Sequence, residues 1–99
     1  MSFEGTWEIV INAPVGKQTA TAEFSVAGDA LKGTLSASQG AMEVEGTVDG
    51  DHARFKGKSK IPFPMTLEYD VALDETGDSF SGKCKSGPFG TFPMTGTRR

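Results

Sequence analysis

Apolar and polar residues alternate one by one along most of this chain, and this alternation limits the fold more than any other feature. The segment TWEIVI at 6–11 places Trp7, Ile9 and Ile11 on one face. The segment MTLEYDVAL at 65–73 places Tyr69 among apolar residues, with charged residues on the opposite face. A period of two is that of a β-strand with one buried face. No stretch has the three- and four-residue apolar spacing of an amphipathic helix, so we expect an all-β chain.

The pattern predicts eight strands in a single domain that spans residues 1–99. The strands are expected at 4–12, 18–27, 30–38, 41–49, 52–60, 64–73, 79–86 and 90–98. Their connections are short, so neighbouring strands should pair as antiparallel hairpins in an up-and-down meander. A meander of eight strands leaves two unpaired edges, and closing the sheet removes both. We therefore predict an eight-stranded antiparallel up-and-down β-barrel.

A short motif recurs at three of the predicted turns, all at one end of such a barrel. It reads GDALKG at 28–33, GDHARFKG at 50–57 and GDSFSG at 77–82. Gly provides the positive φ that tight hairpins need, and Asp stabilises turns through local backbone hydrogen bonds. The apolar residue of each motif (Leu31, Phe55 or Phe80) should point inward and close this end. The glycine that follows it should also face inward, where it lets the strands coil and leaves space inside the barrel.

The opposite end carries different chemistry. Its connections read NAPVGK, SQGA, SKIPFPM and KSGPFG, and three of them contain proline. Apolar loops at the mouth of a barrel are a common place for small-ligand sites. Small residues such as Ala20, Ala22 and Ala37 approach this end from inside. Two interpretations stay open: a ligand cavity under these loops, or Pro-Phe loops that cap a filled core.

Charge and cysteine content argue against several classes of function. The net charge is −3, whereas nucleic-acid binding favours a concentrated positive surface. The single cysteine, Cys84, cannot form an internal disulfide, and with the single histidine, His52, it cannot make a zinc site. No apolar run is long enough to cross a bilayer. We expect no metal, no membrane partner and a cytoplasmic location.

Outward charges provide a prediction of strand register. Opposite charges on neighbouring strands stabilise one register, because a slip by one residue would turn them inward. Folding the predicted hairpins pairs Glu45 with Lys56, and it brings Arg54 near Asp70. The same reasoning about a turn at 74–77 places Glu68 near Lys83.

The two ends of the chain resemble a known superfamily. GTW at 5–7 opens the first predicted strand, and GTR at 96–98 ends the last one. These motifs resemble those of the calycins, which include lipocalins, fatty-acid-binding proteins and avidins, and the strand plan looks more like streptavidin than like a lipocalin. The resemblance implies that Trp7 lies across the closed end with Arg98 stacked on its indole. It also implies a barrel that binds small molecules inside, although the aromatic set that contacts biotin is missing.

The interior expected from the alternation is apolar, and this shapes the functional prediction. Carboxylates point outward, so paired-carboxylate chemistry is disfavoured, and no glycine loop precedes a helix that would bind a phosphate cofactor. We expect no cofactor. Tyr69 stands out because a buried hydroxyl needs a partner, and it is the one candidate for a weak general acid. The candidate ligand-binding residues are Asn12, Gln39, Met42, Phe63, Met65, Tyr69, Phe89, Phe92 and Met94.

The leading hypothesis is a barrel that binds an apolar or aromatic small molecule near the Pro/Phe-rich mouth. The first alternative is a cofactor-independent isomerase, cyclase or lyase that uses the same pocket, with Tyr69 as its acid. The second is a structural or interaction domain with a filled core, which would need an apolar outer face. Outward residues are mostly polar, so we expect a monomer or a weak homodimer.

Overall fold

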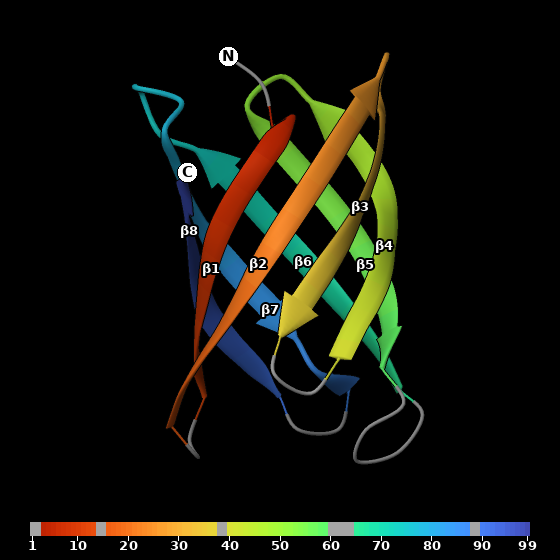
Figure 1. Ribbon diagram of the computed structural model, residues 1–99, viewed down its shortest axis with the longest axis vertical. Helices are drawn as coiled ribbons and strands as arrows, with labels where there is room; N and C mark the ends of the chain where they lie inside the picture. Colours follow the sequence, from red (N-terminus) through yellow and green to blue (C-terminus); the bar gives the residue numbers. More distant parts are fainter. Residues whose placement is uncertain (1–2, 14–15, 38–39, 60–64, 88–89) are drawn as a thin grey trace.

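The alternating segments form eight antiparallel strands that close into a barrel in the computed structural model (Figure 1). The structure describes residues 3–13, 16–37, 40–59, 65–87 and 90–99. The strands are β1 (Gly5–Ala13), β2 (Gly16–Ala27), β3 (Ala30–Ala37), β4 (Gly40–Asp49), β5 (His52–Ser59), β6 (Met65–Leu73), β7 (Ser79–Lys85) and β8 (Thr91–Arg98). Each strand pairs with its neighbour in sequence, and β1 also pairs with β8. The predicted meander barrel is confirmed, with strand limits within two residues of those expected.

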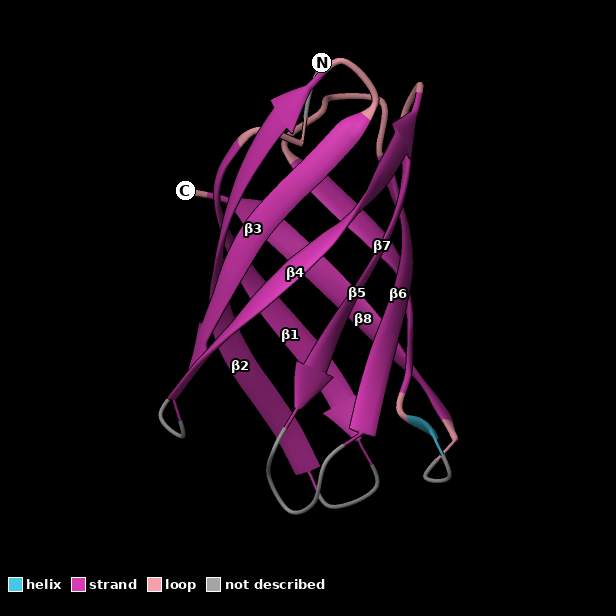
Figure 2. Cartoon of the chain, turned by 90° about the vertical axis from the view of Figure 1, so that its right-hand side faces the viewer, coloured by secondary structure: helices cyan, strands magenta, loops and turns pink. Residues whose placement is uncertain are grey.

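The strands run obliquely around the barrel axis, as Figure 2 shows. The molecule is elongated along that axis, with extents of 34 × 22 × 22 Å. The first residues of β1 and the last of β8 lie at the end that carries the Gly-Asp turns, which we call the closed end. The other end, where β1, β3, β5 and β7 finish, is called the mouth. Within the described ranges, no helix is both long and apolar enough to cross a membrane.

Two of the Gly-Asp repeats are tight two-residue hairpins. Gly28 and Gly50 have φ of 63° and 62°, and no non-glycine residue has a positive φ in the described chain. A positive φ at the first central position alone is that of a type II′ turn, which requires glycine there and matches the twist of the strands. The repeated motif is therefore a hairpin signal, as the sequence indicated.

The third repeat belongs to a longer connection, 74–78, that is built around Asp74. Its carboxylate accepts hydrogen bonds from the backbone N–H groups of Thr76 (3.0 Å) and Gly77 (2.9 Å). The hydroxyls of Ser79 and Thr76 also donate to it. These hydrogen bonds, those from Ser79 and Thr76 foremost, lower the pKa of Asp74 to about 2, because they stabilise the charged form.

The closed end is filled by an aromatic cluster that includes one residue the sequence reasoning missed. Phe3 is fully buried, although it precedes the first strand. Its ring lies 5.9 Å from that of Phe80, which in turn lies 4.8 Å from the indole of Trp7. The Trp7 Nε1–H donates to the Phe3 carbonyl at 2.7 Å, so the segment before β1 folds over this end and seals it.

At the closed end, Arg98 of β8 contacts residues near the start of the chain. Its guanidinium carbon lies 4.3 Å from the centre of the Trp7 ring, the stacking that the superfamily resemblance implied. Its two terminal nitrogens donate to the carbonyls of Glu4 (2.8 Å) and Gly77 (3.1 Å). A planar guanidinium can stack and donate at once, so Arg98 ties the last strand to the first and to the 74–78 connection.

The inward glycines do not leave space, contrary to the sequence expectation. A Cβ on Gly46 would lie 1.9 Å from the Arg54 carbonyl oxygen, and one on Gly82 would lie 2.0 Å from that of Asp70. These glycines let adjacent strands approach closely. At Gly96 the added atom would meet the ring of Phe80 at 2.2 Å. The room is taken by backbone and aromatic rings.

The register of the charged strands follows the prediction in two hairpins and departs from it in one. Glu45 lies opposite Lys56, and Arg54 lies opposite Asp70, 3.5 Å apart between side chains. The expected pairing of Glu68 with Lys83 is wrong: Glu68 faces Lys85. The cause is the 74–78 connection, where the Asp74 N–H donates to the Ser79 carbonyl at 2.9 Å and centres the turn one residue later. The resulting shift of two residues keeps every charge outward.

Candidate functional site

Tyr69, in the middle of β6, is a buried aromatic residue that carries a hydroxyl group. It lies opposite Phe55 on one side and Cys84 on the other. Its side chain is buried, and its ring stacks on Phe55 with centroids 4.8 Å apart and planes at 17°. Phe55 meets Phe24 edge-on at 5.2 Å. These three rings pack in a row across the barrel interior.

A short line of polar atoms runs from Tyr69 toward the mouth. Tyr69 lies opposite Cys84 across β6 and β7, where the thiol affects the pKa of the Tyr69 hydroxyl, and the Cys84 sulfur lies 3.7 Å from the Ser86 hydroxyl oxygen. Cys84 is buried, whereas Ser86 follows β7 at the mouth and is half-buried. The interior therefore offers a hydroxyl, a thiol and a second hydroxyl in sequence, within an otherwise apolar wall.

Both titratable groups of this line are held neutral. Burial, together with the neighbouring Cys84, raises the pKa of Tyr69 well above its usual range. Burial also raises the pKa of Cys84, although hydrogen bonds with Ser86 and Tyr69 partly oppose the effect. Removal from water disfavours the charged form of each group. At neutral pH these groups can exchange hydrogen bonds with a ligand, but the thiol is a poor nucleophile.

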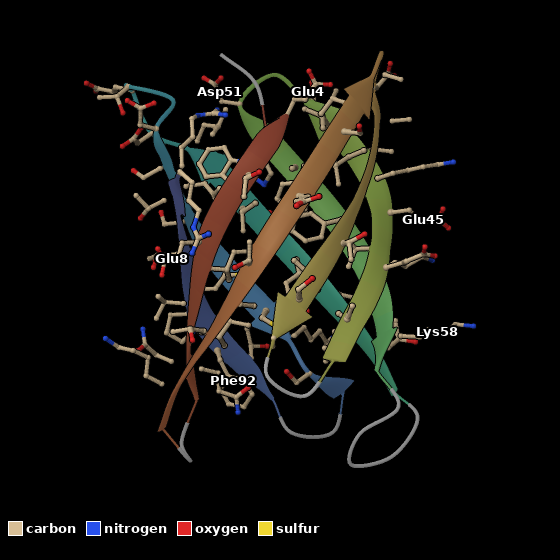
Figure 3. The ribbon with its side chains drawn as sticks, viewed as in Figure 1. Glu4, Glu8, Glu45, Asp51, Lys58 and Phe92 are labelled. Atoms are coloured by element: carbon tan, nitrogen blue, oxygen red, sulfur yellow. The ribbon has the colours of Figure 1, made fainter. Side chains whose placement is uncertain are left out.

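Partly exposed apolar side chains surround this line at the mouth. Ile11, Ala20, Met42 and Leu67 are half-buried and pack against the core. Phe92 of β8 is also half-buried and lies toward the mouth in Figure 3.

Each of these mouth residues lies beside an inward residue of the neighbouring strand. The pairs across strands are Ile11 with Met94, Ala20 with Ile9, Met42 with Leu35, Leu67 with Gly57, and Phe92 with Cys84. Met42 extends over β5, since a Cβ on Gly57 would lie 3.1 Å from its methyl carbon. The mouth is thus lined by apolar surface from several strands around the barrel.

The predicted ligand-binding residues divide into four groups. Tyr69 and Met94 are buried, and Met42 and Phe92 are half-buried at the mouth. Asn12 is exposed, one position beyond inward Ile11. Gln39, Phe63 and Phe89, together with the side chain of Met65, lie outside the described residues.

Four mouth positions were missing from the predicted set: Ile11, Ala20, Leu67 and Ser86. Leu67 sits on the inward face that the alternation of β6 already marks. Ser86 carries no such signal, because it follows the last residue of its strand.

A depression lies on the outer wall, over β4 to β8, and the residues that line it include Phe55 and Tyr69. It has a volume of about 580 Å³ and is open to solvent. Its side walls are outward charged residues of both signs from four strands, with Thr91 from β8. In the same region His52 pairs with Asp70, and this hydrogen bond lowers the pKa of Asp70. Exposed, balanced charges of this kind are screened by salt and stabilise register more than they bind.

The described residues contain no group of three or more His, Cys, Asp or Glu side chains that could hold a metal ion. Charged side chains are also absent from the buried set of the described chain. The described inner wall of the mouth therefore offers hydrogen bonding and apolar contact.

Comparison with known proteins identifies the fold. No family model matches this chain, and the search of curated proteins found no match. A redesigned β-barrel, b11L5F_LGL, aligns with a TM-score of 0.79 at 14% identity, over 97% of this chain and 90% of that one. A second redesigned barrel, mFAP1 bound to DFHBI, aligns at 0.77 and 16% identity, over 96% and 94% of the two chains. A fluorescence-activating β-barrel of de novo design aligns at 0.64 and 20% identity, over 98% and 94%. At these identities the similarity shows the eight-stranded barrel fold alone.

Proposed function

We propose that this protein binds a small apolar or aromatic molecule in the mouth half of its barrel. The observation that carries the proposal is the contrast between the two ends. The closed end is filled by Phe3, Trp7 and Phe80, all of them buried. The mouth instead has half-buried apolar side chains arranged around the Tyr69–Cys84–Ser86 line. Apolar walls with a few convergent polar groups are typical of small-ligand sites.

The similar designed barrels support the same proposal. Two of them, mFAP1 and mFAP0, were solved with DFHBI bound. A barrel of eight strands is just wide enough to hold one small ligand when its interior is not filled by side chains. In the proposed complex the ligand body rests against Met42, Leu67 and Phe92. The neutral Tyr69 hydroxyl, or Ser86 nearer the surface, hydrogen-bonds its polar atom.

A proton-transfer role for Tyr69 is not part of this proposal. A catalytic acid works best with a pKa near the working pH, and the pKa of Tyr69 is displaced in the opposite direction. Binding is accordingly favoured over an isomerase, cyclase or lyase activity. A cytoplasmic location and a monomeric or weakly dimeric state complete the proposal.

We also infer a relationship to the calycins, which the contact between Trp7 and Arg98 supports. In the proposed relationship the closed end is the shared structural feature, and the mouth is where ligand preference differs. Fold alone does not determine a ligand, so binding itself has to be measured.

The test is a titration with N-phenyl-1-naphthylamine, an uncharged aromatic probe whose emission rises in apolar surroundings, and in parallel with DFHBI. Ala20 is half-buried and faces inward, whereas Thr19 beside it is exposed. We expect Ala20→Phe to fill the mouth and abolish saturable binding, whereas Thr19→Phe adds the same ring outside and leaves binding unchanged. Absence of saturable binding of either probe to the unmodified protein would contradict the proposal, as would equal effects of the two variants.

A further inference from the structure

The charged residues are sorted along the barrel axis. At the mouth, the last two described positions of each strand contain three charged residues, Lys17, Lys58 and Lys85, all of them positive and exposed. No Asp or Glu occurs at these positions. The sequence of the mouth connections, 14–15, 38–39, 60–64 and 88–89, adds Lys60 and likewise contains no acidic residue.

The closed end has the opposite sign. The acidic residues in its turns and strand ends are Glu4, Asp29, Asp49, Asp51, Asp74, Glu75 and Asp78. The cations there are Arg98, which stacks on Trp7, and Arg99, which lies 4.0 Å from Glu8, with the single histidine, His52, at the start of β5. Figure 3 shows Glu4 and Asp51 at one end of the barrel, and Lys58 and Phe92 toward the other.

The separation between the two ends makes this sorting effective. The molecule is 34 Å long, whereas charges in physiological salt are screened over about 8 Å. A charged molecule at the mouth therefore interacts with the lysines there, of which Lys85 lies opposite Glu68 on the outer face, and hardly at all with the carboxylates of the closed end. The net charge of −3 is compatible with a locally positive entrance, and such an entrance attracts anions.

The interior sets a second condition on the ligand. No charged side chain is buried in the described part of the barrel, and an anion moved into an apolar interior without a partner carries a large desolvation cost. A negative group on the ligand must therefore stay at the rim. The apolar part of the same molecule can enter the mouth and contact the half-buried side chains of Met42, Leu67 and Phe92.

We propose that the preferred ligand is an amphiphilic anion, with an uncharged apolar or aromatic body and one carboxylate- or sulfonate-like group at its end. The body lies inside the mouth and the anionic group stays outside, among Lys17, Lys58 and Lys85. This inference rests on the proposed function, since it assigns a charge and an orientation to the ligand of the same site.

The test uses two probes with the same aromatic body: N-phenyl-1-naphthylamine, which is neutral, and 8-anilinonaphthalene-1-sulfonate, which carries one negative charge. The triple variant Lys17→Gln, Lys58→Gln, Lys85→Gln should lower the affinity for the sulfonate probe about tenfold. It should change the affinity for the neutral probe less than about twofold. A matched triple, Lys32→Gln, Lys56→Gln, Lys83→Gln, removes the same charge from positions away from the mouth and should leave both affinities within about twofold. Added salt should weaken the binding of the sulfonate probe but not that of the neutral probe. This effect of salt should disappear in the variant that lacks the mouth lysines.

Three results would overturn the inference, and they separate it from the proposed function. An unchanged sulfonate affinity in the mouth triple, with both probes still bound, contradicts the anion preference and leaves the pocket intact. Equal losses in both triples mean that net charge acts and position does not. If neither probe binds the unmodified protein, the pocket itself is absent and both proposals fail.

Discussion

Replacing Arg98 tests whether its contacts with Trp7, Glu4 and Gly77 hold the closed end of the barrel together. The structure allows the contribution of these contacts to the free energy of unfolding to be worked out. The guanidinium carbon lies 4.3 Å from the Trp7 ring centre, a contact that contributes about 1 kcal/mol. Two hydrogen bonds go to the carbonyls of Glu4 and Gly77, and charged donors contribute about 1.5 kcal/mol each. The side chain is 29% exposed, which reduces these values. We expect Arg98→Ala to lower the free energy of unfolding by about 3 kcal/mol.

A loss of that size is easily measured in a chain of this length. For a domain near 100 residues, 1 kcal/mol shifts Tm by about 4 °C or more, so Tm should fall by at least about 12 °C. Urea unfolding followed by far-ultraviolet circular dichroism gives the free energy. The emission of Trp7 gives a second probe, and coincident transitions establish two-state behaviour.

Two further variants sharpen the result. Arg98→Lys keeps the charge but loses the planar fork, and it should recover less than half of the loss. Arg99→Ala removes a neighbouring arginine whose contact with Glu8, at 4.0 Å, is exposed on both sides. It should cost less than about 0.5 kcal/mol. If Arg98→Ala lowers the free energy of unfolding as little as Arg99→Ala does, the contacts of Arg98 do not hold the closed end together.

Other predictions follow from the same contacts. Gly46→Ala puts a methyl group against the Arg54 carbonyl and should cost more than about 2 kcal/mol in urea unfolding; Thr47→Ala, exposed beside it, should stay within about 0.5 kcal/mol. Cys84, buried and with a raised pKa, should not react with a thiol reagent at neutral pH until urea unfolds the protein; fast labelling of the native state would contradict this. The lowered pKa of Asp74, about 2 against 3.8 unfolded, stabilises the fold above about pH 4 and less so as the pH falls toward about 2; Asp74→Asn should flatten this acid limb in a pH series of Tm.

Much of the fold could be predicted from the sequence because strict alternation of apolar and polar residues is compatible with few structures other than half-buried β-strands. A strand with Trp7, Ile9 and Ile11 on one face must bury that face, and short connections then dictate the order of the strands. The Gly-Asp pairs marked their hairpins because only glycine takes the required φ at Gly28 and Gly50. Arg98 was placed by resemblance, and the contact with Trp7 agrees with it.

The errors have local physical causes. Phe3 was missed because it precedes the alternating region, and nothing in a strand pattern indicates that such a segment folds back over Trp7. The pairing of Glu68 was misplaced because the hydrogen bonds of Asp74 centre its turn one residue later. Inward glycines were expected to leave room, but a sequence does not say whether a missing side chain is replaced by solvent, by a ring or by the neighbouring backbone, as at Gly46.

The candidate site was predicted less completely than the fold. Parity along the strands put Met42, Tyr69, Phe92 and Met94 inside, and the structure places them there at different depths. It could not predict the line from Tyr69 through Cys84 toward the surface, because that line depends on which residues face each other across β6 and β7. The charge difference between the two ends likewise emerges only when strands are arranged in space.

The most direct test of the central claim uses the few methionines and the single tryptophan as labels. Protein with ¹³C in its methionine methyl groups and ¹⁵N in its tryptophan is titrated with N-phenyl-1-naphthylamine and followed by NMR. Met42 and Met94 lie on the mouth side, and Trp7 lies at the closed end. Binding in the mouth predicts saturable shifts of the Met42 and Met94 methyl signals, with the Trp7 Nε1–H signal unmoved. A Trp7 shift with unmoved methyl signals, or no shift of any of them at saturating probe, would contradict the account.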